Sequence, residues 1–182
     1  VPEMPARASL AHAGPDTLEQ AAEVIRRAKR PIAVIGANAL RMRNPGALRG
    51  LIERHRIPFA STTMAKGLID ETHPLSLGCI ERACRQIQRT FIHKHADLII
   101  GLGYDTIEVE YEAWAGRVPI LQFDLQTPDV DASVTVAHEV IGDLDASVAA
   151  LAAVQPIENA WSETAVEEQR TAFQRALRPA TA

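Results

Sequence analysis

The sequence predicts an α/β protein built on a doubly wound, parallel sheet of about six strands. Short apolar runs alternate with longer amphipathic segments, as expected when each strand is followed by a helix that crosses back over the sheet. The apolar runs are continuous rather than alternating, which indicates strands covered by helices on both faces. An apolar fraction of 47% in 182 residues is sufficient for a substantial core.

The first predicted helix begins at Thr17. This residue and Gln20 have the spacing of a capping box, and apolar side chains follow on one helical face. The run "PIAVIG", residues 31–36, predicts the first strand, because Pro31 ends the helix and the next residues are apolar.

The second predicted helix begins at Asn44 and Pro45, which have the residue types of an N-cap and a first helical position. Its apolar face includes His55, which we interpret as a packed core histidine. The run "IPFAST", residues 57–62, predicts the second strand.

The middle of the chain contains a stretch without periodicity, residues 63–78, which we interpret as a functional or connecting loop. A helix is expected over about 81–93, and "DLIIGLG", residues 97–103, predicts the third strand. His93 and His95 come just before this strand, where we expect a solvated turn.

The last third of the chain predicts three more strands: "VPILQFD" (118–124), "SVTVAH" (133–138) and "EVIGD" (139–143). A helix capped by Asp143 follows. A weaker helix over 157–177 is expected to pack on something outside this segment.

Ligands of doubly wound sheets bind at the carboxyl ends of the strands, so the loops there are the candidate site. If a nucleotide is bound, the contacts predicted at these loops are Gly36, Ala37, Thr63, Met64, Gly103 and Asp124. The alternative interpretation of the glycines is a tight structural turn, because the run from Gly101 to Thr106 lacks the third glycine of a dinucleotide fingerprint. No HExxH, CxxC or GxSxG pattern is present, so we expect no catalytic and no metal-binding residue.

The order of motifs resembles the central domain of thiamine-diphosphate-dependent enzymes over roughly 18–151. The motifs are "AKRPIAVIGANA", "IPFASTTMAKGLIDETHPLSLG", "ADLIIGLG", "VPILQFDL" and "EVIGDL". In addition, "GLGYDTIEVEYEAW" resembles the GY-x-x-x-E-Y-x-P-x-x-W pattern of catabolic, flavin-free acetolactate (acetohydroxyacid) synthases, from which this chain departs at Val109.

This resemblance implies that the full-length enzyme uses thiamine diphosphate and Mg²⁺, held outside this segment, to decarboxylate a 2-keto acid and transfer the carbanion. Its GDG metal motif is missing here, since Gly142 and Asp143 are followed by Leu144, so we expect the isolated chain to be inactive. An alternative is an ADP- or FAD-binding module of an oxalyl-CoA decarboxylase-like or anabolic acetohydroxyacid synthase-like enzyme. An independent NAD-dependent enzyme of similar architecture lacks a supporting histidine or zinc motif.

Neither FAD nor ADP is expected in this domain. By resemblance to flavin-binding relatives, an arginine near the cofactor would stand two residues after Gly103, but this chain has Asp105 there, with Glu108 and Glu110 close behind. Acidic side chains repel a diphosphate, which favours Arg, Lys or free backbone N–H groups. Tyr104 and Trp114 are then best explained as packing groups.

The domain organisation follows from the resemblance and from linker-like composition at both ends. We expect an interdomain linker (1–16), the central domain (17–154), and a C-terminal helix and linker towards a missing domain (155–182). The expected partners are the flanking pyrimidine-binding and diphosphate-binding domains of the same chain and, at full length, further copies in a homo-oligomer. The net charge of −4 argues against nucleic acid, no apolar run reaches the roughly 20 residues that span a membrane, and a cytoplasmic location is expected.

Overall fold

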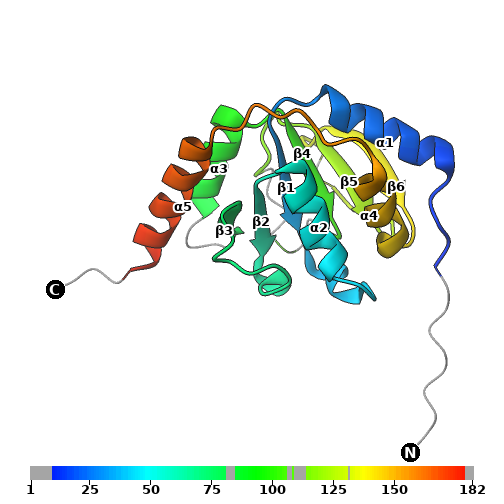
Figure 1. Ribbon diagram of the computed structural model, residues 1–182, viewed down its shortest axis with the longest axis horizontal. Coiled ribbons are helices and arrows are strands. Elements are labelled where there is room, and N and C mark those ends of the chain that lie inside the picture. Colours follow the sequence, from blue (N-terminus) through cyan, green and yellow to red (C-terminus); the bar gives the residue numbers. More distant parts are fainter. Residues whose placement is uncertain (1–9, 81–84, 106–107, 109–113, 131, 179–182) are drawn as a thin grey trace, which may run out of the picture.

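The computed structural model describes residues 10–80, 85–105, 108, 114–130 and 132–178. Six parallel strands form one sheet in the order β3-β2-β1-β4-β5-β6 (Figure 1). This confirms the predicted α/β fold with a doubly wound sheet. The strands are β1 (Pro31–Ile35), β2 (Phe59–Thr62), β3 (Ser76–Ile80), β4 (Leu98–Leu102), β5 (Ile120–Asp124) and β6 (Val136–Ile141).

Helices cover both faces of the sheet (Figure 1). Helices α1, α2 and α4 pack on one face, and α3 and α5 pack on the other. Their bounds are α1 (Pro15–Arg27), α2 (Gly46–His55), α3 (Arg85–His95), α4 (Leu144–Ala153) and α5 (Glu163–Leu177), with short 3-10 turns η1 (Ala37–Arg41) and η2 (Thr63–Ala65).

The strands are buried on both sides, which explains their continuous apolar runs. In β1, Ala33 and Ile35 belong to the core under α1, α2 and α4, whereas Ile32 and Val34 belong to the core under α3 and α5. Because successive side chains of a strand point to opposite faces, one short run contributes to two cores.

Two predicted helix caps were wrong. Helix α1 begins at Pro15, two residues before Thr17, because proline is well suited to the first helical position. Helix α2 has Pro45 rather than Asn44 as its N-cap, and no side chain caps it. The Asn44 backbone N–H instead donates to Asp145 Oδ1 at 2.8 Å.

The predicted cap of α4 is confirmed. Asp143 is its N-cap, and its carboxylate accepts the Ala146 backbone N–H at 3.0 Å. Arg43 Nη2 donates to the same carboxylate at 2.7 Å, so this cap also ties the start of α4 to the segment before α2.

Strand β3 was missed in the sequence, since its residues Ser76–Ile80 begin inside the stretch predicted as a loop. It is an edge strand paired with β2, and it contains Gly78 at φ +85°. A short strand that includes glycine has a weak sequence pattern, because glycine is depleted in strands.

Three further predictions changed in the structure. The runs 133–138 and 139–143 form one strand, β6, rather than two. His93 and His95 lie in the last turn of α3 rather than in a turn after it, and His93 is solvent-exposed there as expected. Helix α5 begins at Glu163, and within this chain it packs on β3 and α3.

Phe173 anchors α5 to the sheet. Its side chain is 7% exposed, clusters with Cys79, and lies over Gly78, where an added Cβ would come within 2.3 Å of the ring. We expect Phe173→Ala to lower the free energy of unfolding by about 3 kcal/mol in urea denaturation, because the ring leaves a cavity. Leu177→Ala on the same helix, where the side chain is 57% exposed, should change it little. Equal effects of the two variants would contradict this packing of α5.

Candidate functional site

The candidate site lies where the strand order reverses, between β1 and β4. In an open parallel sheet the loops diverge at this point and leave the crevice in which ligands commonly bind. The exits of β1, β2, β4 and β5 meet here, so the topology brings together residues far apart in the sequence.

Two glycine turns at this crevice pack against each other. The Asn38 backbone N–H donates to Gly103 O at 3.0 Å. A Cβ at Gly36 would lie 2.3 Å from Tyr104 Cα, and a Cβ at Gly103, which has φ +63°, would lie 2.4 Å from Ala39 N. Both glycines therefore permit close approach of two backbones of the same chain.

The Glu108 carboxylate lies against the same turns. It accepts the Ala37 backbone N–H at 2.9 and 3.0 Å and the Asp105 backbone N–H at 2.9 Å. The Thr62 hydroxyl donates to it at 2.6 Å. One half-buried carboxylate thus joins the exits of β1, β2 and β4.

Other backbone N–H groups of the two turns are also satisfied within the chain. A phosphate at such a turn requires free backbone N–H groups. The donors and acceptors are Gly36 N to Leu102 O, Asn38 N to Gly103 O, Ala39 N to Gly36 O and Gly103 N to Phe123 O.

Asp124 ends β5 and is 2% exposed. It accepts hydrogen bonds from Asn38 Nδ2 at 2.8 Å, the Leu125 backbone N–H at 2.6 Å and Gln122 Nε2 at 3.3 Å. Burial raises the pKa of the carboxyl despite these bonds.

A neighbouring hollow of about 170 Å³ is lined by Asn38, Asp105, Asp124, Gln126, Thr127, Pro128 and Asp129. Its acidic lining is unfavourable for a phosphate.

Tyr104 and Trp114 lie in the core, as expected for packing groups. The Trp114 indole N–H donates to the Tyr104 hydroxyl at 2.6 Å, and the rings meet edge to face with centroids 5.6 Å apart. Burial raises the pKa of the Tyr104 hydroxyl. Their aromatic area therefore fixes the chain after β4 to the sheet.

The structure brings four of the six predicted contacts together: Gly36, Ala37, Gly103 and Asp124 lie at adjoining turns. Thr63 and Met64 lie on η2 beside them, where Thr63 Oγ1 is 3.8 Å from Cys79 Sγ and Met64 is 63% exposed. Sequence reasoning did not foresee the roles of Asn38, Gln122 and Glu108. The sequence feature that could have indicated Glu108 is an acidic residue that follows closely after a strand ending in glycine.

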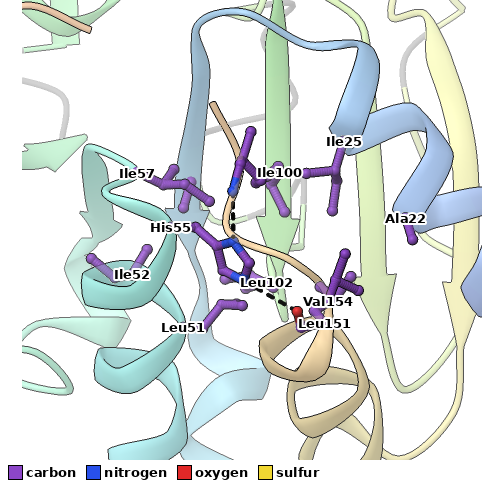
Figure 2. A pocket seen from close by; sticks show the side chains of 12 residues that line it. Ala22, Ile25, Leu51, Ile52, His55, Ile57, Ile100, Leu102, Leu151 and Val154 are labelled. Carbon is purple, nitrogen blue, oxygen red and sulfur yellow. Dashed lines mark hydrogen bonds between the residues drawn. The ribbon is translucent and has the colours of Figure 1, made fainter. Parts of the chain in front are cut away.

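A second pocket surrounds His55 and is lined almost wholly by apolar side chains (Figure 2). Its volume of about 10 Å³ leaves space for no more than about one water molecule. His55 is 2% exposed; Nε2 lies 3.2 Å from Leu151 O, and Nδ1 accepts the Ile157 backbone N–H at 3.3 Å. This confirms the packed core histidine, whose neutral Nε2–H form satisfies both partners.

The described residues contain no group of three or more His, Cys, Asp or Glu side chains placed to hold a metal ion. Within the same described part of the chain, no helix has the length and apolar character that crossing a bilayer requires.

Comparison with known proteins gives a family match. A family model described as "Thiamine pyrophosphate enzyme, central domain" matches residues 18–151. The chain is 28% identical over 137 residues to oxalyl-CoA decarboxylase of Escherichia coli strain K12, an alignment that covers 74% of this chain and 23% of that protein.

Two further relatives point the same way. A probable acetolactate synthase large subunit of Methanococcus aeolicus is 29% identical over 132 residues, covering 71% of this chain and 22% of that protein. A 2-hydroxyacyl-CoA lyase of Oryza sativa subsp. japonica is 46% identical over 59 residues, covering 32% and 10%. The chain therefore spans about a quarter or less of the length of these relatives.

The contact between the glycine turns predicts a large effect of one methyl group. Gly36→Ala should lower the free energy of unfolding by about 2 kcal/mol or more in urea denaturation, because the Cβ meets backbone atoms at 2.3 and 2.5 Å. The matched control is Gly50→Ala in α2, where a Cβ meets nothing within 4 Å. It should raise stability by about 0.8 kcal/mol. A stable Gly36→Ala variant would show that the turns are not packed.

His55 predicts a dependence of stability on pH. Burial lowers the pKa of His55 in the folded state, so the unfolded chain binds more protons at this group. The stability that His55 contributes is present above the ordinary imidazole pKa of about 6.5 and is lost as the pH falls below it. In urea denaturation from about pH 8 to 5, the free energy of unfolding of the wild type relative to His55→Leu should decline as the pH falls below about 6.5. A difference that is constant with pH would contradict the neutral, buried histidine.

Proposed function

The chain belongs to the family of thiamine pyrophosphate enzyme central domains, and from this premise we propose that it is the non-catalytic centre of an acetolactate synthase-like enzyme. In this proposal the rest of the enzyme holds thiamine diphosphate with Mg²⁺, decarboxylates a 2-keto acid and transfers the carbanion. The described residues do not fit that cofactor, because they offer no set of ligands for its metal ion. No step of the reaction is assigned to them.

The role proposed for this domain is a scaffold that holds no nucleotide. One observation carries this role: the two glycine turns use their backbone N–H groups on acceptors of the same chain, including the Glu108 carboxylate. A nucleotide diphosphate would need those donors and would face Asp105 and Asp124 in place of basic side chains.

The acetolactate synthase-like assignment is supported by the position of Glu108. This residue is the glutamate of the GY-x-x-x-E pattern that begins at Gly103, and in the structure its carboxylate lies at the strand exits. The alternative, an ADP- or FAD-binding module of an oxalyl-CoA decarboxylase-like or anabolic acetohydroxyacid synthase-like enzyme, requires that these exits be open to a ligand.

The partners proposed for this domain are the flanking pyrimidine-binding and diphosphate-binding domains of the same polypeptide, and further copies in a homo-oligomer. The flanking domains are supported by the family description as a central domain and by an alignment that covers only 23% of a relative. Light scattering of the full-length protein tests the homo-oligomer, and an active monomer would contradict it.

The proposed function predicts the cofactor content and activity of the full-length protein. It should purify colourless, its acid extract should contain no stoichiometric flavin or ADP, and with thiamine diphosphate and Mg²⁺ it should form acetolactate from pyruvate. The 182-residue chain alone should form none under the same conditions. A flavin absorbance spectrum from the full-length protein, or acetolactate from the isolated chain, would refute the proposal.

A further inference from the structure

We propose that Glu108 is a tethered anion that occupies a small oxyanion site formed by the exits of three strands. The inference rests on the proposed function, a scaffold that binds no nucleotide. It adds the class of ligand that the site selects, a single monovalent carboxylate, which here is the side chain of Glu108. The donors of this site are the Ala37 and Asp105 backbone N–H groups and the Thr62 hydroxyl.

The geometry is that of a bound anion. Both carboxylate oxygens take part: Oε1 accepts from Ala37 N at 3.0 Å and from Asp105 N at 2.9 Å, and Oε2 accepts from Ala37 N at 2.9 Å and from Thr62 Oγ1 at 2.6 Å. Thr62 is fully buried, so its hydroxyl has little access to water as an alternative partner. Hydrogen bonds to an ionised acceptor are roughly twice as strong as neutral ones.

The space for the carboxylate comes from Gly36. A Cβ on this residue would lie 2.6 Å from Glu108 Oε1, closer than carbon and oxygen can approach. A side chain at position 36 would therefore displace the anion, and glycine leaves the space that the Glu108 carboxylate occupies. The loss of the Glu108 side chain would reopen that hollow while its three donors stayed in place.

The charge around the site selects a small monovalent anion over a phosphate. The hydrogen-bond donors to Glu108 are neutral groups, and the acidic residues Asp105 and Asp124 lie at the neighbouring turns. A second negative charge about 5 Å from one of these carboxylates would cost roughly 3 kcal/mol at an effective dielectric of about 20. Formate and acetate fit this charge, whereas a nucleotide diphosphate does not.

The attachment of Glu108 to the chain explains why a free anion does not displace it. An attached group binds its site intramolecularly, with an effective concentration in the millimolar range or higher, whereas a free anion loses translational freedom on binding. The wild-type site should therefore be insensitive to added formate. Removal of the carboxylate should convert it into a site that free formate can fill.

The test is chemical rescue of Glu108→Ala by formate, measured as the thermal unfolding temperature of the 182-residue chain. The variant should unfold at least about 3 °C below the wild type, because a buried hydroxyl and two backbone N–H groups lose their acceptor. Sodium formate should restore about half of that loss with saturation, relative to sodium chloride of equal ionic strength. Inorganic phosphate should restore less than formate.

Two further variants serve as controls. Glu163→Ala removes an 86% exposed carboxylate that pairs with Arg56 on the surface, and it should show no specific effect of formate. Glu108→Gln keeps a side chain of the same shape in the hollow, so formate should not act on it either. If Glu108→Ala failed to fold in chloride, saturable recovery of cooperative unfolding in formate would be the supporting result.

The proposal is overturned if Glu108→Ala unfolds at the wild-type temperature, or if formate shifts all variants equally. It is also overturned if Glu108→Ala does not fold in either salt while Glu108→Gln gains from formate. These outcomes are distinct from a failure of the proposed function, which would be a flavin or ADP in the full-length protein whatever the response of Glu108→Ala to formate.

Discussion

The close contact between the β1 exit at Gly36 and the β4 exit at Gly103 is the constraint on which the rest of the candidate site depends. A Cβ at either position would lie about 2.3–2.4 Å from backbone atoms of the other turn, so only glycine allows the two turns to meet. Across the contact, the Gly36 and Asn38 backbone N–H groups donate to Leu102 O and Gly103 O. Glycines that usually free space for a ligand serve here to close that space.

The electrostatics of this edge follow from the same arrangement. Closed turns leave few backbone donors for a negative charge, and the Glu108 carboxylate binds one from each of two turns together with the Thr62 hydroxyl. The Asp124 carboxylate accepts hydrogen bonds from the Asn38 and Gln122 side chains. The fold of the family is kept, and the two turns at its crevice are packed and hydrogen-bonded to each other, which suits the scaffold role that we propose.

The fold class could be predicted because it depends on local patterns: strands such as β1 are short apolar runs, and burial on both faces makes these runs continuous. Strand β3 was not predicted because a short run that contains Gly78 has a weak strand pattern, and the Phe173 ring that packs on this glycine comes from a helix far along the chain. The loops of the candidate site were predicted from topology, since strand exits meet at one edge. The role of Glu108 was not predictable, because its partners Ala37 and Thr62 are 71 and 46 residues away in sequence. The His55 pairing depends in the same way on Leu151 and Ile157.

That the chain itself closes the crevice at the β1 and β4 exits is tested most directly by titrating ADP and FAD into the ¹⁵N-labelled chain. The signals to follow are the backbone amides of Gly36, Ala37, Asn38, Gly103 and Asp105. These amides donate to Leu102 O, Glu108 and Gly103 O, among other acceptors of the chain. We expect no saturable shift of these signals at millimolar nucleotide, because their donors are already bonded within the chain. Saturable shifts confined to these amides would show that the crevice opens to a nucleotide, and would contradict the account.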